Sequence, residues 1–122
     1  MKIYRTKTFD SAHILKLPYK SKCADSIHGH TWRVEVWIEG TPNKYGMIFD
    51  FQKISDIIDT LDHKFLNEIQ GLEQPTAENI VLWIIKRIKE SLSDGFKLKV
   101  RVWESPKAYA EDEIVVRRRF EL

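Results

Sequence analysis

The sequence contains little cysteine, little net charge and no long apolar run, and each scarcity excludes a class of protein. One cysteine among 122 residues cannot form an internal disulfide, so the fold requires no oxidising compartment. The longest apolar run, IVLWII at residues 80–85, is far shorter than the roughly 20 residues of a membrane-spanning helix. A formal net charge of +2 is too small to indicate nucleic-acid binding by itself.

The remaining composition is that of an ordinary soluble protein. Hydrophobic residues make up 43% of the chain and charged residues 31%, which is typical of globular domains. The length predicts one domain over residues 1–122. The N-terminal residues MKIYRTKTFDSAH lack the apolar stretch of a signal peptide, and we therefore expect a cytoplasmic protein with no membrane partner.

Hydrophobic periodicity predicts four strands and two helices. Alternating or β-branched patterns indicate strands at residues 2–10, 31–39, 97–104 and 113–122. Apolar residues recur at helical spacing over 51–61, and a second helix is expected between an N-cap at Thr76 and a stop at Gly95. The order β-β-α-α-β-β predicts an α+β fold, with a four-stranded antiparallel sheet and both helices on one face. Trp37 and Trp103 fall opposite the apolar faces of their strands, which favours a second covered face and a homo-oligomer.

The stretch CADSIHGH, residues 23–30, combines the cysteine with two of the four histidines. Residues two apart on a strand point to the same side, about 6.6 Å apart along the chain, so His28 and His30 can face one point. His13, at the end of the first strand, is the candidate third ligand because sequential strands are usually neighbours. Three histidines with one open position are typical of catalytic zinc, although copper, iron and nickel also suit imidazole. The alternative is a half-buried histidine pair with no metal.

Cys23, Asp62 and His63 each permit more than one interpretation. Cys23 could be a fourth ligand, a reactive thiolate beside the metal or an inert buried thiol. Asp62 could orient His63 as a general acid or base, but the two residues could equally form an ordinary surface pair.

Six stretches resemble, in the same order, motifs of the family of 6-pyruvoyl-tetrahydropterin and 6-carboxytetrahydropterin synthases. They are FDSAH (9–13), the cysteine and HGH within 23–30, GMIFDF (46–51), LDHKFLN (61–67), PTAEN (75–79) and VWES (102–105). The resemblance implies a T-fold and a Zn²⁺ cofactor. It also implies the following residues: zinc ligands His13, His28 and His30; catalytic Cys23, Asp62, His63 and Glu104; and substrate-binding Glu104, Thr76 and Glu78. Glu104 would grip the amino-pyrimidine edge of a pterin.

The implied activity is that of a zinc-dependent lyase acting on 7,8-dihydroneopterin triphosphate. We expect 6-carboxy-5,6,7,8-tetrahydropterin as the product, with acetaldehyde and triphosphate released, in the biosynthesis of deazapurine tRNA nucleosides. The alternatives are a 6-pyruvoyl-tetrahydropterin synthase and a zinc- and pterin-binding protein without turnover. The resemblance further implies a homohexamer of two stacked trimers, with sites at subunit seams.

Two features stand apart from this resemblance. Four residues separate Cys23 from HGH, whereas three are usual in the bacterial carboxy enzymes and five in the animal pyruvoyl enzymes. In the C-terminal VVRRRFEL, strand alternation would place Arg118 on the opposite face from Arg117 and Arg119, which argues against a nucleic-acid patch. These arginines, or Lys16, Lys20 and Lys22, could bind the substrate's triphosphate.

Overall fold

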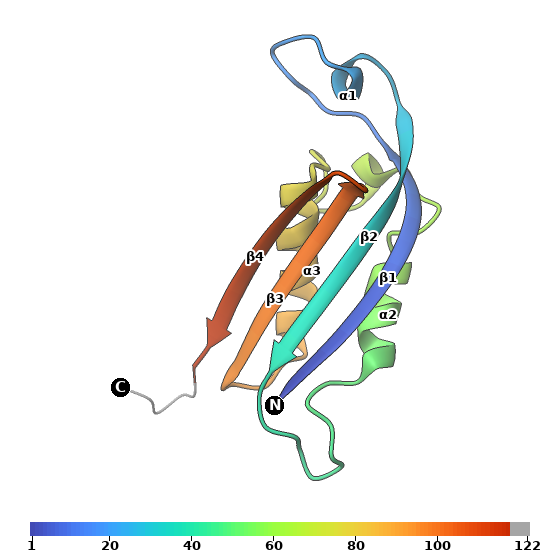
Figure 1. Cartoon of the computed structure of the whole chain (residues 1–122). Helices are drawn as coiled ribbons and strands as arrows, with labels where there is room; N and C mark the ends of the chain where they lie inside the picture. Colours follow the sequence, from blue (N-terminus) through green and yellow to red (C-terminus); the bar gives the residue numbers. More distant parts are fainter. Residues whose placement is uncertain (118–122) are drawn as a thin grey trace.

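The computed structural model describes residues 1–117 of the chain. Four antiparallel strands form one sheet in chain order: β1 (Lys2–His13), β2 (His28–Glu39), β3 (Phe96–Ser105) and β4 (Ala108–Val116). Two helices, α2 (Phe51–Asp59) and α3 (Ala77–Glu90), lie against one face of this sheet (Figure 1). The short helices α1 (Lys22–Asp25) and η1 (Leu66–Glu68) occupy connections. The predicted α+β fold and its β-β-α-α-β-β order of main elements are confirmed.

The core lies between the sheet and the two long helices. Alternate residues of β2, such as Val34, Val36 and Ile38, are fully buried and face the helices. Ile54 on α2 and Ile84 on α3 are also fully buried in the same cluster. The apolar face of the strand, which repeats every two residues, therefore packs against the apolar faces of the helices, which repeat every 3.6 residues. No helix within residues 1–117 is long and apolar enough to span a membrane.

The first turn of α3 begins as predicted, but the helix ends earlier than expected. The Thr76 hydroxyl accepts a hydrogen bond from the Asn79 N–H at 3.1 Å, which is the geometry of an N-cap. The helix ends at Glu90 with Ser91 as the C-cap, before the predicted stop at Gly95. Gly95 instead has a φ of 90° and leads directly into β3, a conformation that glycine adopts without steric cost.

The strand boundaries differ from the predictions mainly at the end of the sheet that holds the histidines. β1 continues beyond residue 10 to His13, and β2 begins at His28 rather than residue 31. β4 begins at Ala108, five residues before the predicted start, after a two-residue turn at 106–107. β4 is a largely exposed edge strand, and its first six residues, Ala-Tyr-Ala-Glu-Asp-Glu, give no alternation of apolar and polar residues. The predicted continuation over residues 118–122 lies outside the described residues.

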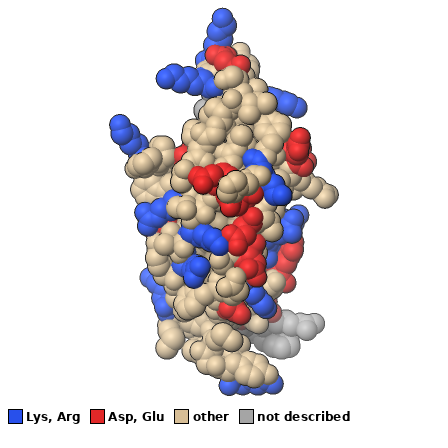
Figure 2. Space-filling view, turned by 90° about the vertical axis from the view of Figure 1, so that its right-hand side faces the viewer, with Lys and Arg blue, Asp and Glu red and all other residues tan. Residues whose placement is uncertain are grey.

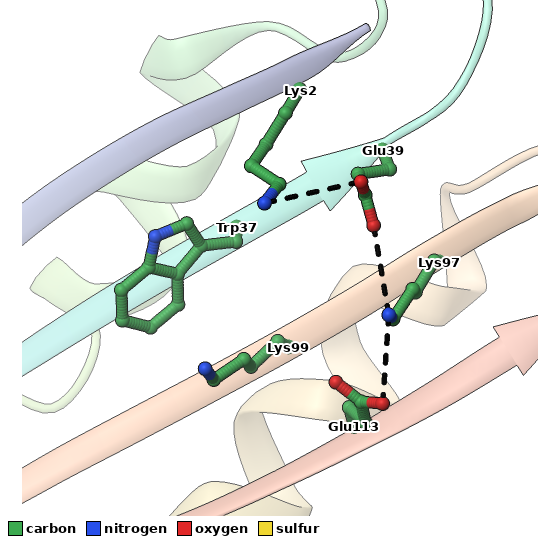
Figure 3. A pocket seen from close by; sticks show the side chains of 6 residues that line it. All are labelled: Lys2, Trp37, Glu39, Lys97, Lys99 and Glu113. Carbon is green, nitrogen blue, oxygen red and sulfur yellow. Dashed lines mark ion pairs between the residues drawn. The ribbon is translucent and has the colours of Figure 1, made fainter.

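The face of the sheet without helices is charged and aromatic. Lys2, Glu39, Lys97 and Glu113 form a row of ion pairs across all four strands, with N–O distances of 3.7–3.9 Å (Figure 3). Trp37 lies beside this row (Figure 3), and Trp103 projects from the same face, as predicted. The homo-oligomer inferred from these tryptophans stays a prediction.

Glu35 is a buried carboxylate within this otherwise exposed face, with only 6% of its surface exposed. It accepts hydrogen bonds of 2.6 Å from the Tyr4 hydroxyl and from the Trp103 indole N–H. Burial acts to raise the pKa of Glu35, but these two hydrogen bonds together with Arg33 and Arg101 hold it below its ordinary value. Glu35 therefore links β1, β2 and β3 as an anion.

Candidate metal centre and active site

Strand register brings three histidines together at one end of the sheet. His13, the last residue of β1, is the direct partner of His28, the first residue of β2. His30 follows two residues later on the same face of β2, as a period of two requires. The ring centroids of the three histidines lie 4.6–5.0 Å apart. The predicted convergence of His13, His28 and His30 is confirmed.

Backbone carbonyls fix the orientation of two of these imidazoles. The Nδ1 of His13 lies 2.8 Å from the carbonyl oxygen of Pro75, and the Nδ1 of His28 lies 3.0 Å from that of Ser26. A carbonyl oxygen can only accept, so each Nδ1 carries the proton and donates it. The Nε2 of each neutral ring is consequently a bare acceptor, available to a metal.

The two bare nitrogens face each other at a separation that a shared cation would satisfy. His13 Nε2 and His28 Nε2 are 3.0 Å apart, and neither has a proton to donate when the rings are neutral. A proton or a metal ion could satisfy both nitrogens. Burial lowers the pKa of His13 more than its bond to Pro75 raises it, and burial also lowers the pKa of His30, against the opposing effect of Glu104. These shifts disfavour protonation of His13 and His30.

Glu104 adds a carboxylate to the cluster from β3. Its Oε1 lies 3.1 Å from His30 Nε2 and 3.7 Å from His13 Nε2. One ligand atom from each of the four residues falls within 4.8 Å of all the others. Three imidazoles and a carboxylate are donors that a divalent transition metal accepts, and tetrahedral zinc is among the ions that fit. Sequence reasoning assigned Glu104 to the pterin, so its place among the three clustered histidines is an addition.

A hollow next to Glu104 joins the metal cluster to the start of α3. Glu78, in the first turn of α3, lines this hollow of about 470 Å³ together with Glu104 and the edge of β4 at 108–111. The two carboxylates can accept from N–H groups of a ligand placed between them. Thr76 is absent from this lining, and its hydroxyl caps α3. Within the described chain, the predicted proximity of Glu78 to the site is therefore supported more directly than that of Thr76.

Asp62 and His63 form the predicted pair outside the histidine cluster. His63 Nδ1 lies 2.9 Å from Asp62 Oδ2, and the other carboxylate oxygen of Asp62 accepts from the Asp10 N–H at 2.9 Å. The Asp10 N–H is the main cause that lowers the pKa of Asp62, and the bond to His63 lowers it further. His63 has a φ of 53°, which is uncommon for a non-glycine residue, and its side chain is 80% exposed. The metal cluster found within residues 1–117 includes neither residue.

Cys23 lies in α1, within the loop of residues 14–27 that extends beyond the histidine end of the sheet (Figure 1). Its side chain lies outside what the structure describes, so its catalytic role stays a prediction.

Sequence reasoning missed the carbonyls of Pro75 and Ser26. Pro75 opens the quoted PTAEN motif and Ser26 lies within the quoted CADSIHGH, but a backbone acceptor has no residue-specific signal.

The fold and the cluster together define the class of protein: a T-fold protein with three histidines and a carboxylate, which could hold a metal ion, at one end of its sheet. The chain belongs to the 6-pyruvoyl tetrahydropterin synthase family, whose sequence profile matches residues 2–113. A Pyrococcus abyssi protein, provisionally named a 6-carboxy-5,6,7,8-tetrahydropterin synthase, is 43% identical over 90% of this chain and 88% of its own length.

Two further similar proteins have names that describe other activities. A Pyrococcus furiosus protein named dihydroneopterin monophosphate aldolase is 41% identical over 84% of this chain and 87% of its own length. The structure of the Caenorhabditis elegans 6-pyruvoyl tetrahydropterin synthase aligns with a TM-score of 0.74 at 25% identity, over 93% of this chain and 95% of that one. Similar sequences and folds in this family therefore carry different named activities.

Proposed function

We propose that the chain is a zinc-dependent lyase that converts 7,8-dihydroneopterin triphosphate and water to 6-carboxy-5,6,7,8-tetrahydropterin, acetaldehyde and triphosphate. The observation that carries the proposal is the pair of bare Nε2 atoms of His13 and His28, 3.0 Å apart beside His30. In a member of this family, such a cluster is best explained as a catalytic zinc site with room for substrate. The name of the Pyrococcus abyssi relative supports the carboxy product.

The metal and the residues around the cluster would have separate roles in activating, binding and positioning the substrate. Bound zinc would act as a Lewis acid that acidifies hydroxyls and polarises a carbonyl of the substrate side chain. Glu104 and Glu78 would bind the N–H and amino groups of the pterin in the hollow that they line. Thr76 would hold the start of α3 in place through its cap.

Proton transfer is assigned to Cys23 and His63. A thiol and an imidazole both titrate near neutrality when their surroundings shift them modestly, which suits transfers between carbon and oxygen. The anionic Asp62 would orient His63 through its 2.9 Å contact with Nδ1. The exposure of His63 is compatible with a site completed at the surface of the subunit, as in the homohexamer that the resemblance implies.

The loop lysines are the better candidates for binding the triphosphate. Lys16, Lys20 and Lys22 are exposed on the loop beyond the histidine end of the sheet. Figure 2 shows basic side chains projecting from this tip of the molecule. Arg117 follows β4 at the opposite end of the sheet, away from the metal cluster (Figure 1). The product would then enter the synthesis of deazapurine tRNA nucleosides in the cytoplasm.

A second candidate activity is aldol cleavage of a dihydroneopterin monophosphate, favoured by the name of the Pyrococcus furiosus relative. The same metal and carboxylate positions would serve a substrate with a shorter phosphate chain. Elimination of triphosphate to give the 6-pyruvoyl product is a third candidate. A pterin-binding protein without turnover is a fourth.

Mass spectrometry of the products separates these candidates. Zinc-loaded protein is incubated in parallel with dihydroneopterin triphosphate and dihydroneopterin monophosphate, and acetaldehyde is trapped as a hydrazone. We expect 6-carboxytetrahydropterin and acetaldehyde from the triphosphate. A 6-pyruvoyl product, cleavage of the monophosphate alone, or tight pterin binding without any product would each replace the proposal by the corresponding alternative.

A further inference from the structure

The chain that leaves β1 after His13 remains paired, although no strand lies beside it. The Ile14 N–H donates to the Asn67 side-chain oxygen at 3.0 Å, and the Ile14 carbonyl accepts from the Asn67 amide nitrogen at 2.7 Å. Two residues later, Lys16 makes the same pair of contacts with the Gln74 side chain, at 2.9 and 3.0 Å. A primary amide offers an N–H donor and a carbonyl acceptor side by side, as a neighbouring strand would, and it has a second N–H to spare, so the two side chains act as a substitute strand.

Gln74 lies next to the carbonyl that orients His13, and Asn67, in η1, is bonded to the same segment. The Asn67 amide donates additionally to the Glu73 carbonyl at 3.3 Å, and the Gln74 carbonyl accepts from the Asn79 side chain at 2.8 Å. The next residue, Pro75, accepts from His13 Nδ1 at 2.8 Å. The 73–76 segment therefore orients an imidazole through Pro75 and pairs with Lys16 through Gln74, while Asn67 connects this segment to Ile14.

The loop between Lys16 and His28 depends on this starting point. The two backbone hydrogen bonds that begin α1 are local, because the Ala24 and Asp25 N–H groups both donate to the Ser21 carbonyl. Local bonds shape a loop but do not place it relative to the rest of the molecule. Lys16 is the last residue of the loop's N-terminal side that the paired amides hold, and Cys23 follows seven residues further along the chain.

We propose that Asn67 and Gln74 are positioning residues that set the placement of the 14–27 loop relative to the metal-binding histidines. The kinetic consequence rests on the proposed function, in which Cys23 on this loop transfers a proton. Displacing a catalytic group by about 1 Å can cost on the order of a hundredfold in rate. In this role the amides touch neither metal nor substrate, and they act through the placement of the loop.

The test compares Asn67→Ala, Gln74→Ala and the double variant with a matched control. Gln52→Ala removes an exposed amide from α2, where it bonds only to Asp56 among the described residues. Zinc content and the urea midpoint establish that each variant is folded. Backbone hydrogen exchange, measured by NMR on the full chain, then reports on the loop.

We expect the double variant to raise exchange at least tenfold at the hydrogen-bonded amides of residues 14–27 and to lower kcat ten- to hundredfold, with zinc content unchanged. KM for the triphosphate should rise as well, because Lys16, Lys20 and Lys22 lie on the same loop. Asn67→Asp and Gln74→Glu keep the acceptor but lose the donor, and should fall between wild type and alanine. A general structural role would instead lower zinc content and the urea midpoint together.

Two results would overturn the positioning role. One is unchanged exchange in the loop beyond Ile14 and Lys16, and the other is faster exchange with kcat unchanged. If the wild-type protein itself shows no turnover, the proposed function fails separately, and the exchange result alone decides whether the amides place the loop.

Discussion

Replacing Glu104 by glutamine separates two roles that the geometry allows for its carboxylate. Glu104 Oε1 lies 3.1 Å from His30 Nε2, as a metal ligand would, and also lines the hollow beside Glu78, as a pterin anchor would. Glutamine keeps the size of the side chain but removes its charge and turns one acceptor into a donor. A charge-assisted hydrogen bond contributes roughly 1.5–3 kcal/mol, so we expect the Kd for dihydroneopterin to rise about 10- to 150-fold.

Zinc affinity should change by less than about tenfold, because three imidazoles remain as ligands. Calorimetry with dihydroneopterin measures the first quantity, and competition with a chromophoric chelator measures the second. Glu113→Gln is the matched control, since Glu113 lies on the opposite face of the sheet in an exposed ion pair with Lys97. Loss of zinc with pterin affinity unchanged would refute the reasoning and make Glu104 a metal ligand.

Three further predictions concern the metal, the thiol and the helix-free face. His28→Ala should reduce bound zinc well below one ion per chain by elemental analysis, and full occupancy would remove His28 from the site. Cys23→Ala should retain zinc and KM but lose at least about a hundredfold in kcat, the usual contribution of acid–base catalysis, whereas a wild-type rate would exclude this role. Glu35→Gln should lower the free energy of unfolding by about 2–3 kcal/mol at pH 7 and fixed protein concentration. Since the folded pKa of Glu35 lies below its ordinary 4.5, this contribution is present above pH 4.5 and is lost as the pH falls through the folded pKa. A difference between Glu35→Gln and wild type that stays constant from pH 7 to pH 3 in urea titrations would contradict the assignment.

The parts of the fold that could be predicted are those in which one face of an element is apolar. Val34, Val36 and Ile38 alternate along β2 because their face is buried, and this pattern located the strand correctly over 31–39. The predicted start of β4 was five residues too late, because β4 is an edge strand and its acidic residues Glu111, Asp112 and Glu113 hide the strand pattern. Its start at Ala108 depends on pairing with β3, which no local pattern encodes.

The histidine cluster was predictable for the same reason, whereas its supporting contacts were not. A period of two places His28 and His30 on one face, and adjacency of the first two strands adds His13. The orientation of His13 depends on the Pro75 carbonyl, 62 residues away in sequence, and a carbonyl is present in every residue. Glu104 lies beside His30 because β3 pairs with β2, and this pairing is visible only in the three-dimensional structure.

The most direct test of the account is a crystal structure of the zinc-loaded protein with anomalous scattering measured across the zinc absorption edge. If the three histidines bind zinc, one anomalous peak per chain is expected, about 2.0–2.1 Å from the Nε2 atoms of His13, His28 and His30. The Nδ1 atoms of His13 and His28 should remain on the carbonyls of Pro75 and Ser26. Zinc bound through Nδ1, zinc at another site, or no zinc at full loading would contradict it.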